Sequence, residues 1–98
     1  MVADIFKAVY EFVKTIPQGK VTTYGVIGKK LGINPRVVGY ALHSNPEKRV
    51  IPCHRVVFKD GSLAKGFVFG GEEGQRALLE TEGVSFSAVS KVDASCIL

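Results

Sequence analysis

The chain has 98 residues, 46% of them hydrophobic and 22% charged, which is typical of one soluble globular domain. No apolar run approaches the length of a membrane span, and the N-terminus lacks the basic and apolar segments of a secretory signal. Two cysteines do not make a disulfide framework, so we expect reduced thiols in an intracellular protein.

The net charge of +4 is unevenly distributed along the chain. Residues 20–55 contain seven basic residues and one acidic residue, whereas residues 56–98 contain four basic and six acidic residues. Basic charge concentrated in one half indicates a surface that binds phosphate. A solvated basic face without a partner gives the same pattern, so charge alone leaves both interpretations open.

The first predicted element is a helix that supports the rest of the fold. Asp4 can cap it, and apolar residues from Ile5 to Val13 follow at helical spacing. Pro17-Gln18-Gly19 then ends the element.

Two short helices are predicted next. Thr22 or Thr23 can cap a helix that runs to about Leu31, and two glycines within it indicate close packing or a short element. Asn34-Pro35 begins the second helix, which Ser44-Asn45-Pro46 ends. The pair forms a helix-turn-helix pattern whose second helix we expect to meet DNA, although such pairs also occur in folds that bind no nucleic acid.

The segment from Arg49 to Phe58 is predicted to be extended and carries the reactive side chains. Within Ile51-Pro52-Cys53-His54-Arg55-Val56-Val57, a thiol, an imidazole and a guanidinium interrupt an apolar run, and such buried polar groups are costly unless paired. Cys53 beside His54 is a candidate nucleophile, but strand neighbours point to opposite faces, so direct contact is awkward and a bridging water would help.

Other interpretations of these residues remain open. Cys53 can be a small buried apolar residue and His54 a satisfied core histidine. The carboxylate that would orient His54 must come from elsewhere, and Glu73, Glu80 and Glu82 are the candidates. The cysteines and histidines lack the paired short spacings of a zinc site, and no phosphate-binding loop is present.

The last part of the chain is predicted to hold a turn at 59–62, a Gly-rich aromatic arm at 63–71 and one more helix. The arm lets the backbone approach a flat or bulky group closely. The helix begins at Glu72 and Glu73, buries Ala77, Leu78 and Leu79, and is capped by Gly83. From residue 85 the pattern is weak, so we expect a peripheral or frayed tail.

Ile51-Pro52-Cys53-His54-Arg55-Val56 resembles the active-site signature of the O6-alkylguanine-DNA alkyltransferases (methylated-DNA–protein-cysteine methyltransferases). Further blocks of that family occur in the same order, between residues 5 and 84: Gly19-Lys20-Val21-Thr22-Thr23-Tyr24-Gly25, Arg36-Val37-Val38-Gly39, Asn45-Pro46 and Leu78-Leu79-Glu80-Thr81-Glu82-Gly83. The resemblance implies the C-terminal catalytic domain of such a protein. We therefore expect one domain over residues 1–98, with a core at about 1–84 and a tail at 85–98. The expected fold is mainly α with a small β element, a winged-helix-like helix-turn-helix domain.

The family's chemistry would make Cys53 the acceptor in a single-turnover DNA-repair reaction. Its thiolate would attack the alkyl carbon on O6 of guanine, with O4 of thymine as a further candidate position, and keep the alkyl group as a thioether without metal or cofactor. By motif position, Glu82 would orient His54, and His54 would deprotonate Cys53 through water. Asn45 would stabilise the active-site turn, and Tyr24 would donate a hydrogen bond or proton to the leaving guanine.

The implied partner is double-stranded DNA containing O6-alkylguanine, bound by a cytoplasmic monomer with no membrane association. The target base would flip out of the duplex, and Arg36 would enter the vacated space. The expected DNA-binding residues lie mainly on the second helix of the pair: Arg36, Thr23, Tyr24, Val37, Gly39, Tyr40, Ala41 and Arg55. The expected pocket residues are Tyr24, Leu42, Val56, Phe67 and Val68.

Two alternatives compete with the alkyl acceptor. Alkyltransferase-like proteins bind the lesion without chemistry and generally have Trp in place of the reactive thiol, so Cys53 argues against them. A small DNA-binding regulator would leave Cys53, His54 and Tyr24 unexplained. The chain also departs from the family pattern, since Gln75 stands where some members have Lys and Val68 lacks the hydroxyl that some members use near O6.

Overall fold

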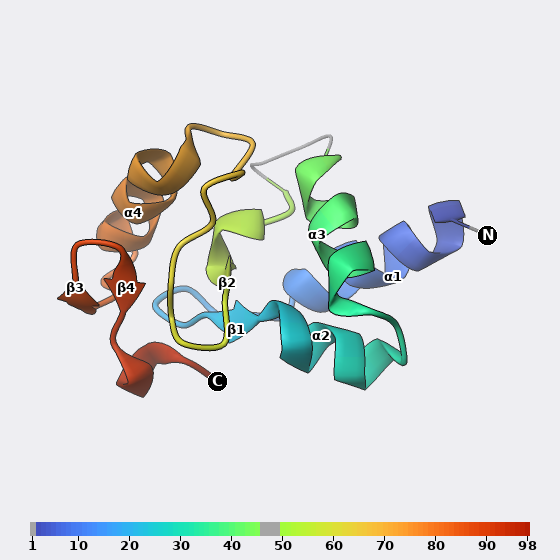
Figure 1. Cartoon of the computed structure of the whole chain (residues 1–98), viewed down its shortest axis with the longest axis horizontal. Coiled ribbons are helices and arrows are strands. Elements are labelled where there is room, and N and C mark those ends of the chain that lie inside the picture. The colour runs from blue at the N-terminus through green and yellow to red at the C-terminus, as the bar shows by residue number, and fades with distance from the viewer. Residues whose placement is uncertain (1, 46–49) are drawn as a thin grey trace.

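The computed structural model describes residues 2–45 and 50–98. Within these ranges the chain is mainly α-helical with two small sheets, which confirms the expected winged-helix-like fold class. The elements in chain order are α1 (Val2–Val13), β1 (Thr22–Thr23), α2 (Tyr24–Leu31), α3 (Pro35–His43), the 3-10 helix η1 (Cys53–Arg55), β2 (Val56–Val57), α4 (Gly71–Thr81), β3 (Phe86–Ala88), β4 (Lys91–Val92) and the 3-10 helix η2 (Ala94–Cys96). Figure 1 shows α1, α2 and α3 grouped at one end and α4 with β3 and β4 at the other.

The first helix starts earlier than the sequence predicted. It begins at Val2, so Asp4 lies within its first turn and is not its cap. A carboxylate there still interacts favourably with the partial positive charge of the helix N-terminus. Val9 and Val13 are fully buried, as the apolar spacing predicted, whereas Ala8 is exposed.

The helix-turn-helix prediction is confirmed down to its caps. The Thr23 hydroxyl accepts a hydrogen bond from the Val26 backbone N–H, and the Asn34 side chain accepts one from Arg36 N–H. Gly32 ends α2 with a φ of 69°, a left-handed conformation that glycine adopts without steric cost.

Close packing between the two helices explains a glycine inside α2. A Cβ atom at Gly28 would lie 2.7 Å from the Ile33 carbonyl oxygen, so no larger residue fits without a shift of the backbone. The Ile33 N–H in turn donates to the Gly28 carbonyl, which draws the turn onto the helix.

A two-residue parallel sheet joins the helix pair to the reactive segment. Thr22 pairs with Val56, and Thr23 pairs with Val57. Because β1 runs directly into α2 and β2 directly follows η1, this pairing fixes the start of α2 beside Cys53.

The extended conformation predicted for 49–58 is wrong over the reactive residues. Only Val56 and Val57 form a strand, whereas Cys53–Arg55 form a 3-10 helix. Pro52, with a φ of −77°, directly precedes this helix, and the Arg55 N–H donates to the Pro52 carbonyl at 3.0 Å. In a 3-10 helix successive side chains are about a third of a turn apart, so they need not alternate between two faces.

The α4 prediction holds for its position but not for all of its buried face. The helix begins at Gly71, with Glu72 and Glu73 in its first turn. Gln75 and Leu79 are its buried residues, whereas Ala77, which we expected to be buried, is exposed.

The C-terminal segment packs onto the domain, so of the two expected states, peripheral or frayed, it is not frayed. Val92 and Cys96 are buried, and the Leu98 N–H donates to the Val21 carbonyl at 2.8 Å. The segment closes a second apolar cluster beside the one under the helices, formed by Val21, Val57, Leu63, Leu79, Val84, Val92 and Cys96. No helix in the described ranges is long and apolar enough to cross a membrane.

Candidate active site and DNA-binding surface

Cys53 and His54 are both buried in the 3-10 helix η1, with 4% and 8% of their surfaces exposed. The Cys53 N–H donates to the Ile51 carbonyl at 2.8 Å, and the Val56 N–H donates to the Cys53 carbonyl. In this tight turn Cys53 lies in the wall of a pocket, whereas the His54 imidazole contacts Glu82.

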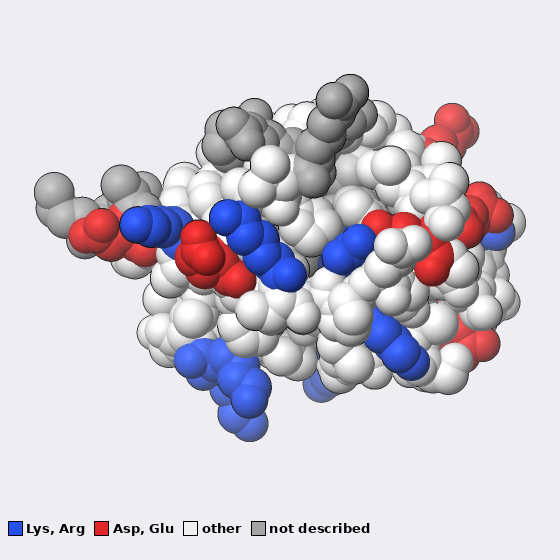
Figure 2. Space-filling model, turned by 180° about the vertical axis from the view of Figure 1, so that it is seen from behind, with Lys and Arg blue, Asp and Glu red and all other residues white. Residues whose placement is uncertain are grey.

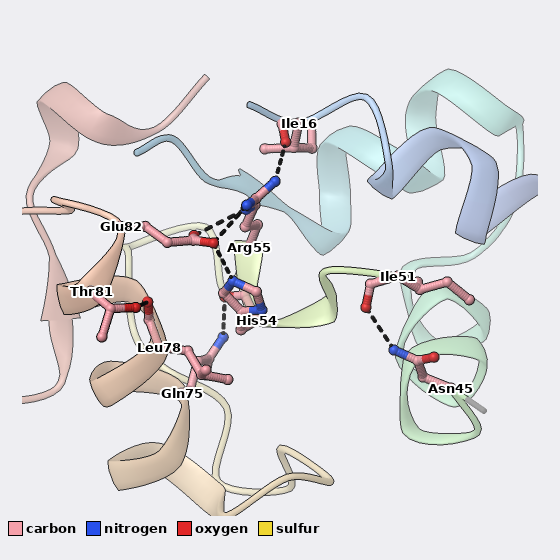
Figure 3. Close-up of polar contacts among 9 residues, drawn as sticks. All are labelled: Ile16, Asn45, Ile51, His54, Arg55, Gln75, Leu78, Thr81 and Glu82. Atoms are coloured by element: carbon pink, nitrogen blue, oxygen red, sulfur yellow. Dashed lines mark hydrogen bonds and ion pairs between the residues drawn. The ribbon is translucent and has the colours of Figure 1, made fainter. Parts of the chain in front are cut away.

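His54, Glu82 and Arg55 form one polar cluster between η1 and the end of α4 (Figure 3). His54 Nε2 is buried and lies 3.0 Å from Glu82 Oε2. Arg55 Nη2 donates to the same oxygen at 2.6 Å, and Arg55 Nε donates to Oε1 at 3.0 Å. Of the three carboxylates that the sequence left open, Glu82 is the one at His54, since Glu80 pairs with Arg76 and Glu73 is exposed.

The protonation states of this cluster follow from burial and neighbours. Burial lowers the pKa of His54, although contact with Glu82 opposes that change. Burial by itself would raise the pKa of Glu82, but hydrogen bonds from Arg55 and then His54 outweigh it, and the pKa is lowered. At neutral pH the cluster therefore holds a neutral imidazole beside a charged carboxylate.

The sulfur of Cys53 is a thiol at rest. Burial raises its pKa above the ordinary value of 9.0, while a hydrogen bond from the Asn45 side chain acts in the opposite direction. Burial outweighs this opposing contact. A thiolate at this position therefore requires a base that takes the proton.

Asn45 and Gln75 hold the reactive turn from two sides. The buried Asn45 side chain donates from Nδ2 to the Ile51 carbonyl at 2.9 Å. Gln75, which is fully buried, donates from Nε2 to the carbonyls of His54 and Val56 at 3.0 and 2.9 Å, and its Oε1 accepts from Ala64 N–H at 2.8 Å. Sequence reasoning noted Gln75 only as a departure from the family pattern; a polar residue on the buried face of α4 was the available signal.

Cys53 lies in the wall of a pocket of about 650 Å³, within the range of sites that hold drug-sized molecules. Eight of the expected site residues line it: Tyr24, Arg36, Gly39, Tyr40, Leu42, Cys53, Phe67 and Val68. The lining that sequence reasoning missed comprises Gly25, Pro35, His43, Phe58, Lys59, Ala64 and Gly66. Val56, expected in the pocket, is fully buried and contributes only its backbone to the Gln75 contact.

Aromatic side chains surround the pocket. The Tyr24 ring packs against Phe58, with 5.0 Å between centroids, and Phe58 is 48% exposed. Burial and the neighbouring Cys53 raise the pKa of Tyr24 to about 12, so its hydroxyl keeps its proton and can donate a hydrogen bond. His43 Nδ1 lies 3.3 Å from the Gly66 carbonyl and links the end of α3 to the Gly-rich arm.

The expected DNA-binding residues divide into exposed and buried groups. Arg36 and Tyr40 are exposed on α3, and Gly39 lies with them along the pocket. Ala41 is fully buried in the core, and Thr23 is buried with its hydroxyl bound as the α2 cap, so neither offers its side chain to a ligand.

The basic excess of residues 20–55 has an exposed part at the end of α2. Lys29 and Lys30 lie in the last turn of that helix and are both exposed. Figure 2, which views the reverse face, shows basic side chains at the edge where α2 lies and mixed charges along a band across the rest. Within residues 2–45 and 50–98, no group of three or more His, Cys, Asp or Glu side chains could hold a metal ion.

Arg55 does not occupy the position expected of a DNA-binding residue. Its side chain is 16% exposed, it does not line the pocket, and Nη1 donates to the Ile16 carbonyl at 2.7 Å. The guanidinium is thus bound within the protein on every nitrogen.

Comparison with known proteins gives consistent matches. A family described as 6-O-methylguanine DNA methyltransferase, DNA binding domain, matches residues 4–84. The methylated-DNA–protein-cysteine methyltransferase of Thermococcus kodakarensis is 47% identical over 79 residues, which are 80% of this chain and 44% of that protein. The DNA base-flipping protein of Thermus thermophilus is 43% identical over 75 residues, 76% of this chain and 49% of that protein.

The structural match extends over the whole chain. The crystal structure of S. pombe Atl1 in complex with damaged DNA containing O6-carboxymethylguanine superposes with a TM-score of 0.80 at 34% identity, covering 98% of this chain and 95% of that one. The chain spans about half the length of the curated relatives it matches. On these matches, the chain belongs to the 6-O-methylguanine DNA methyltransferase family, over the DNA-binding domain of that family.

Proposed function

We propose that this chain repairs DNA by moving an alkyl group from O6 of guanine to Cys53. The observation that carries the proposal is a thiol in the wall of a mainly apolar pocket, one residue away from a neutral imidazole backed by a charged carboxylate. An apolar pocket suits a flat base, and the imidazole can take the proton that the thiol must lose.

In the proposed reaction, His54 takes the Cys53 proton through a water molecule and Glu82 stabilises the imidazolium. The sulfur then attacks the alkyl carbon, a C–S bond forms, and the C–O6 bond breaks with its electron pair left on guanine. Tyr24, which keeps its proton, donates a hydrogen bond toward the developing negative charge. The product thioether has no easy reverse step, so each molecule acts once and needs no cofactor.

The partner in this proposal is double-stranded DNA containing O6-alkylguanine. The target atom is unreachable in a stacked duplex, so the base must flip into the pocket. Arg36, exposed on α3 and in the pocket lining, is placed to enter the space that the base leaves. We assign this activity to a single domain over residues 1–98, equivalent to the C-terminal catalytic domain of longer relatives.

Lesion binding without chemistry is the second candidate. The structural match to S. pombe Atl1 and the sequence match to the Thermus thermophilus base-flipping protein favour it. The two candidates differ at the thiol: a binding protein needs the pocket but not a sulfur with a base nearby.

Intact mass after incubation with a duplex containing O6-methylguanine separates the two candidates. We expect wild-type protein to gain one methyl group, Cys53→Ser to gain none, and Cys96→Ser, in the second apolar cluster, to gain one. Wild-type protein that binds the lesion duplex without any gain of mass would establish the binding-only candidate instead.

A further inference from the structure

The position of Arg55 lets it influence Glu82 and His54 without contacting the substrate of the proposed reaction. Its Nε and Nη2 bind both oxygens of Glu82 at 3.0 and 2.6 Å, and its Nη1 binds the Ile16 carbonyl at 2.7 Å. This forked contact fixes the plane of the carboxylate as well as its position.

Glu82 needs such a partner because of where it lies. It is the C-cap residue of α4, where the last carbonyl groups of the helix carry a partial negative charge that repels a carboxylate. Its side chain is only 13% exposed, so water compensates it little. Arg55 supplies the positive charge that keeps an ionised carboxylate at this position.

Arg55 and His54 also share one oxygen. Both Arg55 Nη2 and His54 Nε2 contact Glu82 Oε2, at 2.6 and 3.0 Å. The stronger, charge-assisted contact belongs to Arg55, so only part of the carboxylate's attraction remains for a proton on His54. The charged groups against His54 are Glu82 from α4 and Arg55 from its own turn; Gln75 of α4 is neutral and binds the His54 backbone.

We propose that Arg55 is a positioning residue, whose guanidinium holds Glu82 in place and keeps His54 neutral so that the imidazole can accept the Cys53 proton. The inference rests on the proposed function, because it assumes that His54 acts as the base. The pKa of His54 responds to its surroundings in the direction that this role requires. Burial lowers it, contact with Glu82 opposes that change, and the nearby Arg55 charge lowers it further.

The test is the pKa of His54, measured by NMR of its imidazole in the folded protein. Arg55→Gln removes the charge but keeps one N–H donor for Glu82, and Arg55→Lys keeps the charge but loses the fork. Arg76→Gln is the matched control, because Arg76 also pairs with a glutamate of α4, Glu80 at 3.3 Å, and donates to the Val89 carbonyl, yet is absent from the cluster.

We expect the His54 pKa to rise by roughly one unit in Arg55→Gln and by less in Arg55→Lys, with no change in Arg76→Gln. The acid limb of the methyl-transfer rate should move to higher pH by the same amount. If Arg55→Gln does not fold, Arg55→Lys decides: a raised His54 pKa supports the proposal.

A His54 pKa that is unchanged or lowered in the folded Arg55 variants would overturn the role of Arg55. Wild-type protein that takes up no methyl group would contradict the proposed function instead, and the NMR comparison would still report whether Arg55 controls His54.

Discussion

The burial of Cys53 determines how its reactivity must be controlled. An exposed low-pKa thiolate would react with many electrophiles, whereas a buried thiol with a raised pKa reacts only when a base takes its proton. The turn of η1 supplies such a base in the next residue, with its own pKa lowered so that it is neutral near pH 7. If the proposed function holds, this arrangement would restrict the reaction to a substrate held in the pocket.

Alkylation by iodoacetamide should report the raised pKa of Cys53. Because the pKa lies above 9.0, the thiolate fraction and the alkylation rate should keep rising with pH beyond 9, whereas the urea-unfolded chain should level off near the ordinary value. The measurement uses Cys96→Ser so that Cys53 is the only thiol. A rate that levels off below pH 8 in the folded protein would contradict the assignment of a resting thiol.

Gln75 should contribute more to stability than a single neutral side chain in the sequence suggests. Gln75→Leu would leave two buried carbonyls and one buried N–H without their partner, so we expect a loss of roughly 3 kcal/mol in the free energy of unfolding. Urea denaturation provides the measurement. The control is Gln18→Leu at an exposed position, and equal stability of the two variants would show that the turn does not depend on Gln75.

At the scale of elements, local signals in the sequence determined most of what could be predicted. The caps at Thr23 and Asn34 and the glycine at 32 act within a few residues, and each lies at the expected helix end. The conformation of Cys53–Arg55 could not be predicted from such local signals. Its apolar flanks resemble a strand, but Gln75 and Glu82, both from α4, bind this turn or its side chains in the 3-10 form.

Part of the pocket lining likewise could not be predicted, because it depends on contacts between residues far apart in the sequence. Phe58 and Ala64 follow an apolar strand and a turn, where an aromatic or small residue carries no functional signal of its own. They join the lining because the β1–β2 pairing brings their segment beside α2.

The exposed helix α3 should matter for duplex DNA and not for a free base. Arg36→Ala removes a side chain that would hold the base flipped out, so we expect transfer from duplex O6-methylguanine to slow about tenfold or more. Transfer from free O6-benzylguanine should change little, because a free base needs no flipping. Lys65→Ala, exposed and outside the pocket lining, is the control; equal slowing on both substrates would remove the flipping role from Arg36.

Across the whole molecule, the polar cluster adds a polar link between segments that also meet in the first apolar cluster, where Leu78 of α4 packs against a set of buried residues that includes Val9 and Val13 of α1. Arg55 reaches the Ile16 carbonyl after α1, and Glu82 lies at the end of α4, so the cluster joins the helical end of the molecule to the C-terminal end (Figure 1). The C-terminal segment packs into the second apolar cluster through Val92 and Cys96. Its packing could not be predicted from its weak apolar pattern, because the few residues that it buries contact residues far away in the sequence.

The contribution of Glu82 to stability should depend on pH. Its pKa is lowered in the folded state, so its stabilisation is fully present above the ordinary value of 4.5 and is lost as pH falls through the folded-state pKa. At pH 7, Glu82→Gln leaves the Arg55 charge without its partner, and we expect it to be less stable than wild type by about 3 kcal/mol, the low end for a buried pair because both side chains keep some exposure.

As the pH falls below 4.5 and Glu82 becomes protonated, wild type should lose this advantage and approach the stability of Glu82→Gln. Both proteins should already weaken below pH 6.5, because His54 holds its proton less readily when folded than when unfolded. Urea denaturation at several pH values measures the gap between the two proteins, and the exposed Glu11→Gln variant should show none. A gap that stays constant from pH 7 to pH 3 would mean that the ionised Glu82 carboxylate does not hold the two ends of the molecule together.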